Sequence, residues 1–379
     1  MVHNLWCTSQ DCLNLSQLVL HLRTRINLTK DVVNRIASYL KLPRLNILAR
    51  TDMYVSNKIR YAFWDTTCPP FEFCRDDFEV GEEEGQLIAC DFRFQVLAFA
   101  WEDGSLHTVK VVSKHRQQDI TNVIGPSAAF SSDGITFAVP VFISGNACIA
   151  VYHVIHNPDS LLSDRIKIFW PAQAVLLVAR RFIPMSFSPN AETLAFAGEG
   201  QIFFVDLIGQ SFSGCTQRYD TFDISAVQYS PDGRFVAAAG NDLHSDYRIK
   251  FYGFIYMFDD MGNNLWKLAS DSTGGRLLGI DALSFSPCST KIACTNQSTD
   301  DARLYIVDIN SGRAHMLRVL DPVWYVAFDP SAQRLITVHS SSICILDIMS
   351  GAKLHEALFF DSSLTIEAIS WPEDNREDD

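Results

Sequence analysis

Val227-Gln228-Tyr229-Ser230-Pro231-Asp232-Gly233 is the stretch that decides the fold. Apolar and polar residues alternate up to an aromatic side chain, which is typical of a half-buried strand, and Ser-Pro-Asp-Gly then supplies the residues of a tight turn. An apolar run, Arg234-Phe235-Val236-Ala237-Ala238-Ala239, follows directly. The sequence therefore predicts two antiparallel strands joined by a short turn.

The same pattern returns along most of the chain. Its aromatic residues are Phe130, Phe187, Tyr229, Phe285, Phe328 and Trp371, in steps of 57, 42, 56, 43 and 43 residues. Several copies continue into a third apolar strand that ends at an aspartate, namely Asp206, Asp259, Asp308 and Asp347. A period of roughly 40–45 residues is typical of a four-stranded propeller blade, so we attribute the two longer steps to insertions. An earlier, more diverged copy covers Gln86 to His115.

Small side chains on the first strand of each copy support this interpretation. Of the twelve positions that lie one or three residues before the aromatic, ten hold small residues, and the exceptions are Gln228 and Tyr325. The innermost strands of a propeller crowd a central channel, which favours small side chains on one face. The first strand of each copy is therefore predicted to lie innermost.

These units resemble WD repeats, over roughly residues 86 to 371. The Trp-Asp pair of the family is replaced by Val-Asp, Phe-Asp or Leu-Asp, and the usual Gly-His is absent. The resemblance implies a mainly β fold, a six- or seven-bladed WD-like β-propeller. Because the family's Asp/His/Ser/Trp network lacks its residues, we expect packing to hold the blades together. The strand that ends at Trp371 needs partners, which residues 59 to 80 could supply.

The periodicity changes before the repeats. Apolar residues fall at helical spacing at Leu15, Leu18, Val19 and Leu22, and again at Val32, Val33, Ile36 and Leu40. Thr29 is a suitable N-cap, and Pro43 suits the first turn of a third helix. The expected domains are a helical segment at 1–60, a linker or closing strand at 61–85, the propeller at 86–371 and an acidic tail at 372–379.

Residues 28–60 of this helical segment resemble an F-box. The matching positions are Leu28, Val32, Ile36, Leu40, Leu42, Leu45 and Leu48, followed by Val55-Ser56. Thr29 and Ile59 depart from the family, which has Pro and Trp near these positions. The resemblance implies that these apolar residues bind a Skp-type adaptor of a cullin ubiquitin ligase, while the propeller holds the substrate. The alternative is a helical extension that packs on its own propeller.

Net charge and cysteine content limit the classes of binding partner and the cellular compartment that we expect. The net charge is -13 and the pI about 5.2, which argues against a surface for nucleic acid or an anionic membrane. The ten cysteines form no CxxC pair and no zinc-type spacing, and Cys90, Cys294 and Cys344 lie in apolar strand-like runs. We expect buried thiols in a reducing cytosolic or nuclear compartment. No stretch reaches the length of a membrane span.

The sequence contains no P-loop, GxSxG, HExxH or GxGxxG motif, and we expect no catalytic residue, metal or cofactor. The entrances to the first strands are the expected ligand face. The substrate-binding candidates there are Arg180, Arg181, Asp281, Trp324, Tyr325 and Glu367. Aromatic residues beside carboxylates would suit a basic or apolar peptide, although Trp324 could instead cap its own blade. Three functions stay open: a ubiquitin-ligase substrate receptor, a scaffold subunit of another complex, and an enzyme with a site at the channel mouth.

Overall fold

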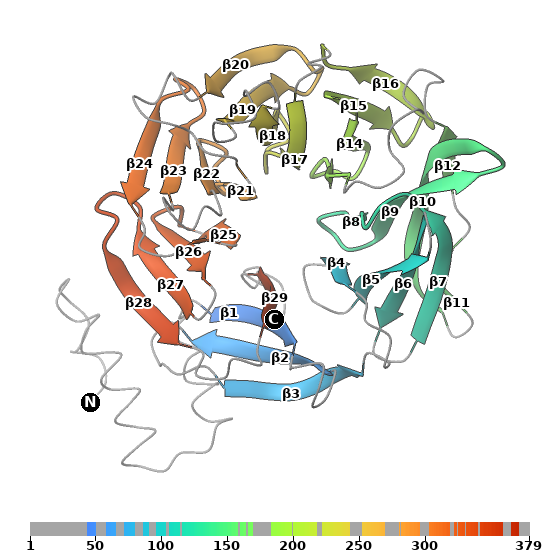
Figure 1. Ribbon diagram of the computed structural model, residues 1–379, viewed down its shortest axis with the longest axis horizontal. Helices are drawn as coiled ribbons and strands as arrows, with labels where there is room; N and C mark the ends of the chain where they lie inside the picture. Colours follow the sequence, from blue (N-terminus) through green and yellow to red (C-terminus); the bar gives the residue numbers. More distant parts are fainter. Residues whose placement is uncertain are drawn as a thin grey trace, which may run out of the picture. The chain divides into compact units, whose positions relative to one another are not determined.

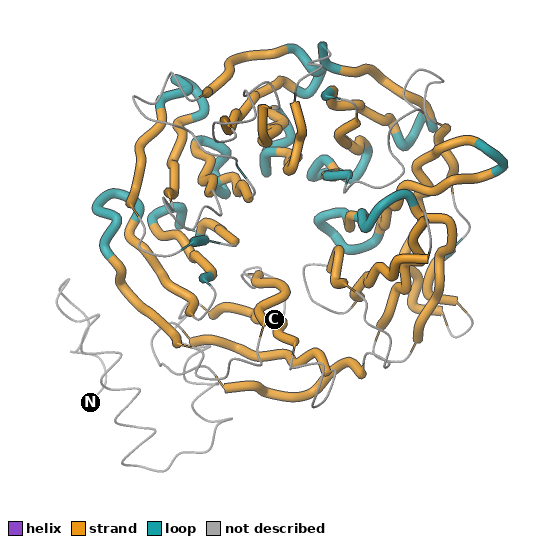
Figure 2. Tube along the Cα trace, viewed as in Figure 1, coloured by secondary structure: helices purple, strands orange, loops and turns teal. Residues whose placement is uncertain are grey.

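The computed structural model describes strands and turns from residue 44 to residue 370. The described ranges are 44–50, 58–65, 72–79, 86–90, 96–103, 106–113, 116–157, 160–163, 166–169, 183–198, 200–217, 222–242, 252–269, 280, 282–295, 303–318, 322–323, 325–329, 331–339, 342–358 and 365–370. Within these ranges all regular structure is β (Figure 2). The chain forms two compact units, one of residues 1–79 with 355–379 and one of residues 80–354.

The first unit contains one four-stranded antiparallel sheet. Its order is β29-β1-β2-β3, with β29 at Thr365–Ser370, β1 at Arg44–Arg50, β2 at Lys58–Asp65 and β3 at Glu72–Glu79. β29 pairs directly with β1, from Asn46↔Ser370 to Arg50↔Thr365. The predicted partners at 59–80 correspond to β2 and β3, whereas the strand beside β29 lies earlier in the chain.

The prediction of helix after Pro43 is wrong. Residues 44–50 and 58–65 are strands, so Leu45 and Leu48 of the F-box-like segment belong to β1. Their spacing fits one face of a helix, but a segment of seven residues is too short for periodicity to distinguish helix from strand, and pairing with β2 and β29 decides between them. Leu28, Val32, Ile36, Leu40 and Leu42 lie outside the described residues.

The second unit contains the repeats. Its strands form six consecutive groups of antiparallel strands, each built on four strands, which we number as blades 1 to 6 (Figure 1). Blade 1 comprises β4 (Gln86–Cys90), β5 (Val96–Asp103), β6 (Leu106–Ser113) and β7 (Arg116–Val123). Blade 2 comprises β8 (Ala129–Phe130), β9 (Thr136–Ile143), β10 (Asn146–Asn157) and β12 (Ile166–Phe169), with the short β11 (Ser160–Leu162) on the end of β10. Val123 and Val141 pair and so join these two blades into one nine-stranded sheet.

The remaining blades follow the sequence repeat. Blade 3 comprises β13 (Met185–Phe187), β14 (Thr193–Gly198), β15 (Gln201–Asp206) and β16 (Ser211–Cys215). Blade 4 comprises β17 (Phe222–Tyr229), β18 (Phe235–Asp242), β19 (Tyr252–Asp259) and β20 (Asn264–Ala269). Blade 5 comprises β21 (Ala282–Phe285), β22 (Lys291–Thr295), β23 (Arg303–Asp308) and β24 (Ala314–Arg318). Blade 6 comprises β25 (Tyr325–Phe328), β26 (Arg334–Val338), β27 (Ser342–Asp347) and β28 (Lys353–Leu358). The part of β28 that follows Leu354 belongs to the first unit by the division given above.

A hydrophobic cluster fills the space between each blade and the next. Val109 and Val141 belong to the cluster between blades 1 and 2, and Leu194 and Ile149 to the cluster between blades 2 and 3. Further clusters join blades 3 and 4, 4 and 5, and 5 and 6. The central strands β14, β18, β22 and β26 are apolar on both faces because each blade packs on two neighbours. This is the stacking of propeller blades, and the predicted fold class is confirmed.

The first strands of consecutive blades lie next to one another: β4 contacts β8, and the contacts continue through β13, β17 and β21 to β25. Small residues permit this approach. Ser127 and Ala129 are buried, and Ser186, Ser284 and Ala327 are half-buried. Figure 1 shows these strands on the inner side of the second unit and the fourth strands on its outer side.

Candidate protein-interaction surface

The turn from the first to the second strand of a blade is built on a hydroxyl. In blade 4, Ser230 Oγ accepts the Phe235 N–H at 3.0 Å and donates to Asp232 Oδ1 at 2.7 Å. The Gly233 N–H closes the turn on the Ser230 carbonyl at 2.9 Å. Side-chain hydrogen bonds to the local backbone are the usual role of Ser and Asp in turns. The equivalent residues at the start of the turn are Ser131, Ser188, Ser286 and Asp329.

Blade 6 exchanges the two side chains of this turn. Asp329 stands in the serine position, where its Oδ1 accepts the Arg334 N–H at 2.9 Å. Ser331 stands in the aspartate position and donates its hydroxyl proton to Asp329 Oδ2 at 2.6 Å. The same bond thus forms with donor and acceptor exchanged, so the turn keeps its shape.

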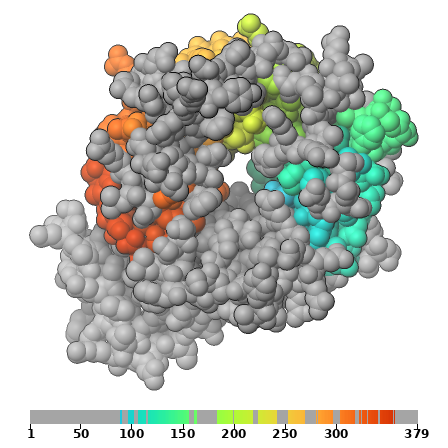
Figure 3. All heavy atoms as spheres, viewed as in Figure 1, coloured from blue at the N-terminus to red at the C-terminus, as the bar shows by residue number. Residues whose placement is uncertain are grey.

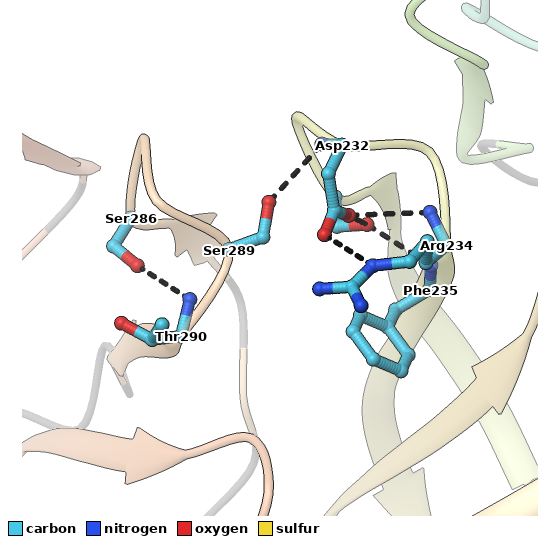
Figure 4. A network of polar contacts seen from close by, with 7 residues as sticks. Asp232, Arg234, Phe235, Ser286, Ser289 and Thr290 are labelled. Atoms are coloured by element: carbon cyan, nitrogen blue, oxygen red, sulfur yellow. Dashed lines mark hydrogen bonds and ion pairs between the residues drawn. The ribbon is translucent and has the colours of Figure 1, made fainter.

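Neighbouring turns are linked to each other. Ser132 Oγ of blade 2 donates to the Pro189 carbonyl of blade 3 at 3.0 Å. Gly233 of blade 4 lies against Pro189, since a Cβ atom on the glycine would be 3.5 Å from the proline Cδ. The Asp232 N–H donates to Ser289 Oγ of blade 5 at 3.1 Å (Figure 4). The turns of blades 2 to 5 therefore form a continuous, cross-linked arc.

One ion pair lies on this arc. Arg234 Nε is 2.7 Å from Asp232 Oδ2, and its guanidinium lies over the Phe235 ring at 5.3 Å (Figure 4). Although partial burial raises the pKa of the Asp232 carboxyl, hydrogen bonds from Ser230 and Arg234 outweigh this and hold the pKa below its ordinary value. An exposed pair of this kind adds little stability but fixes the side chains in place.

A second row of turns, between the third and fourth strands, lies on the same side. In blade 5, Asp308 Oδ1 accepts the N–H and the hydroxyl of Ser311, at 2.8 and 2.7 Å. The Ile309 N–H donates to the Thr290 carbonyl at 2.9 Å, which ties this turn to the first one. Equivalent bonds join Leu207 to Glu192 and Ile348 to Gln333. We call the side formed by both rows of turns the turn face.

Large apolar side chains stand exposed on the turn face. Ile208, Met261 and Met349 are 71, 76 and 79% exposed. Each lies two residues after the aspartate that ends the third strand, and Asn310 holds this position in blade 5. Ile135, in the first turn of blade 2, is 54% exposed. An exposed apolar side chain thus recurs at one turn position in blades 3, 4 and 6.

Of the predicted substrate-binding residues, the structure describes two, and Tyr325 does not lie on the turn face. Tyr325 is the first residue of β25, at the opposite end of that strand from the Asp329 turn, and is 40% exposed. Glu367 lies in β29, in the first unit. Arg180, Arg181, Asp281 and Trp324 lie outside the described residues. Ile208, Met261 and Met349 were not singled out from the sequence, although each lies two positions after an aspartate that ends a third strand.

At the strand ends opposite the turn face, hydroxyls of the half-buried Ser225 and the buried Thr295 connect the blades. Ser225 Oγ of blade 4 donates to the Ile280 carbonyl, and Thr295 Oγ1 of blade 5 donates to the Val323 carbonyl at 3.3 Å. In blade 6 the buried His339 ring lies 3.0 Å from Thr337 Oγ1 and 3.2 Å from the Pro322 carbonyl. The packing that holds the blades together is therefore supplemented by individual hydrogen bonds. WD repeats have an Asp/His/Ser/Trp hydrogen-bond network for this purpose.

The described part of the chain contains no cluster of metal ligands. Its His, Cys, Asp and Glu side chains form no group of three or more that could hold a metal ion. It also contains no helix long and apolar enough to cross a membrane.

Comparisons with known proteins agree on the fold. No family model and no curated protein sequence matches this chain. A chain of the mitotic checkpoint complex superposes with a TM-score of 0.52 at 16% identity, over 73% of this chain and 78% of that one. A chain of hydrazine synthase from Kuenenia stuttgartiensis superposes with a TM-score of 0.50 at 15% identity, over 72% and 86%. At such identities the likeness establishes a WD40-like β-propeller fold and nothing about activity.

Proposed function

We propose that this WD40-like β-propeller is a non-catalytic scaffold that holds a partner protein on its turn face. The observation that carries the proposal is the repeated exposure of Ile208, Met261 and Met349 at one turn position. In the free protein these apolar side chains are exposed to water. Burying them against a partner would lower the free energy and so favour binding. Methionine also adapts its shape to a partner, which suits a contact surface.

The rigidity of the turn face supports the same function. The cross-links at Ser132 and Ser289 hold neighbouring turns in a fixed arrangement before any partner arrives. A preorganised surface loses little conformational entropy on binding. Because the apolar residues come from separate blades, the partner must contact several turns at once.

The test identifies the partner first and then weakens the contact. A photoreactive amino acid at position 261 or 349 should form adducts with one protein in cells, whereas the same label at Ser213, an exposed residue of β16, should not. With that protein purified, the double variant Met261→Asp, Met349→Asp should bind at least about tenfold more weakly, which corresponds to 1.4 kcal/mol. Unchanged affinity of the double variant would rule out the turn face.

A finer proposal is that the scaffold is the substrate receptor of a cullin-type ubiquitin ligase. It rests on the F-box-like pattern at Leu28, Val32, Ile36, Leu40 and Leu42, since β1 takes the later positions. Such a subunit would act in the cytosol or nucleus. Co-purification of the full chain with a Skp-type adaptor, lost on Leu40→Asp, is the expected result. Without that complex, the general scaffold role remains.

A further inference from the structure

β7 is the outermost strand of blade 1, and one of its edges is nearly unpaired. β6 pairs with it from Ser113↔Arg116 to Val109↔Ile120 and again at His107↔Val123, with a bulge in between at Thr121 and Asn122. On the other edge, the described strands pair with β7 only at Val123, opposite Val141 of β9. An open strand edge presents backbone N–H and C=O groups that a further strand can bind. The stretch from Asp119 to Asn122 is the part of β7 that offers them, as regular strand at Asp119 and Ile120 and as a bulge at Thr121 and Asn122, where the φ of Asn122 is 60°.

A cavity of about 590 Å³ follows this edge. Residues 118–122 of β7 form one wall, and Phe142, Tyr152 and Leu162 of blade 2 contribute to the other. Tyr152 and Leu162 are buried, whereas Phe142 is 37% exposed. Five residues of a strand span about 17 Å. The groove therefore has the length that a short extended peptide needs, and its lining is mainly polar, with Phe142 as an exposed apolar contact.

The walls are fixed without a ligand. Gln118 Oε1 accepts the Leu162 N–H at 3.0 Å, which fastens β11 to β7. The Ser163 N–H donates to the His153 carbonyl at 2.9 Å and holds the end of β11 on β10. The β9–β10 hairpin, green in Figure 3, stands out from the surface there. The groove is thus preorganised, which lowers the entropic cost of binding.

The groove carries a negative charge. Asp119 is exposed and is the one ionisable carboxylate among the described residues that line it. Lys110 lies opposite Asp119 in the β6–β7 register, but its ammonium is 4.9 Å above the Trp101 ring. The Asp119 carboxylate is therefore available to a cation, and burying it beside an acidic ligand would be unfavourable.

We propose that this groove binds an extended peptide segment of a partner protein, which adds to β7 as a fifth strand and places a Lys or Arg against Asp119. Main-chain hydrogen bonds to β7 would supply affinity, and Asp119 with Phe142 would supply specificity. The groove lies on the strand edge, not on the turn face, so this binding is separate from the one proposed above.

The test uses the purified full-length chain and a random 12-residue peptide library displayed on phage. We expect enriched peptides to share a Lys or Arg within an alternating apolar pattern. Bound to the chain as synthetic peptides, they should slow hydrogen exchange of the β7 amides. Asp119→Lys should weaken their binding at least tenfold, and Asp119→Asn should weaken it less and reduce its dependence on salt.

The matched control is Asp260→Lys, the same charge change at an exposed residue of the turn face. It should leave peptide affinity within about twofold, and circular dichroism should show both variants folded. Enrichment of no peptide, or equal affinity for the wild type and Asp119→Lys, would overturn the proposal. Either result leaves the turn-face scaffold intact, because that function is measured with Met261 and Met349.

Discussion

Five equivalent turn residues on the turn face hold a backbone φ between 54° and 75°: Gly134, Ala191, Gly233, Ser289 and Ala332. Outside glycine this conformation costs roughly 1–2 kcal/mol. Ser289 recovers part of the cost through its hydrogen bond from Asp232, and the methyl group of Ala332 packs on the core between blades 5 and 6. Ala191 is half-buried and is the best position at which to measure the strain.

Ala191→Gly should stabilise the protein by about 0.5–1 kcal/mol, since relief of the positive φ exceeds the greater flexibility of glycine in the unfolded chain. Urea unfolding gives the difference. The control is Ala195→Gly, at a fully buried residue of β14, which should destabilise by about 1 kcal/mol or more. A loss of stability in Ala191→Gly would contradict the interpretation.

The carboxylate of Asp308 makes stability depend on pH. The hydrogen bond from the Ser311 side chain lowers the pKa of Asp308 below its ordinary value. A carboxyl whose pKa is lower in the folded state stabilises above the unfolded pKa, near 4, and loses this contribution as the pH falls through the folded pKa. Between pH 5 and 3 the unfolding free energy should therefore fall less steeply in Asp308→Asn and in Ser311→Ala than in the wild type. Equal slopes in denaturant titrations would exclude this role.

At the scale of the element, the turn between the third and fourth strands of one blade packs against the preceding blade. Gly262 of blade 4 lies beside Phe204 of blade 3, and Gly351 of blade 6 lies beside Leu317 of blade 5. Trp266 Nε1 donates to the Ile309 carbonyl of the next blade at 2.7 Å. These turns therefore hold adjacent blades in register as well as reversing the chain.

Gly262→Ala should destabilise the protein by about 3 kcal/mol. The new Cβ would lie 2.8 Å from Phe204 Cε2, and the φ of +82° adds strain. Gly145→Ala is the matched control, because its φ is +83° and nothing lies within 4 Å of the new atom. The control should lose only about 1–2 kcal/mol. Similar losses in both variants would show that the contact with Phe204 carries no weight.

At the scale of the whole molecule, the sequence predicted the blades because the first three strands of each have strong apolar patterns. The fourth strands could not be located in this way, since they face solvent: β16 is exposed at four of its five residues. The alternation that marks a strand is lost when neither face is fully buried. β1 was missed for another reason, because its conformation is decided by pairing with β2 and with β29, which lies more than 300 residues later.

The contact surface was predictable to a smaller extent. The pattern indicated the turns but directed attention to the opposite ends of the first strands, where Ser225 makes an interblade hydrogen bond and Ile183 is buried. Whether an apolar residue such as Met261 is exposed depends on the packing of neighbouring blades, which no local pattern contains. The groove at Asp119 forms only when two blades and a hairpin have packed together. No pattern in the sequence predicts it.

Deletion of residues 365–379 should destabilise the first unit, because it removes β29 and leaves the β1 edge unpaired. We expect its thermal transition to fall by at least about 5 °C, since a loss of 1 kcal/mol corresponds to roughly 4–8 °C for a unit of about 100 residues. The control deletion, residues 372–379, keeps β29 and should shift the transition by less than about 2 °C. Calorimetry distinguishes the two; equal transitions would show that β29 adds no stability.

The pairing of β1 with β29 also sets an order in time. A ribosome that adds about 5–20 residues per second needs about 15 to 60 s to make the stretch between Arg50 and Thr365. During that interval the nascent chain must carry β1 without the strand that completes its sheet. The first unit is thus completed last, and chaperones that shield open strand edges should bind the growing chain for most of its synthesis.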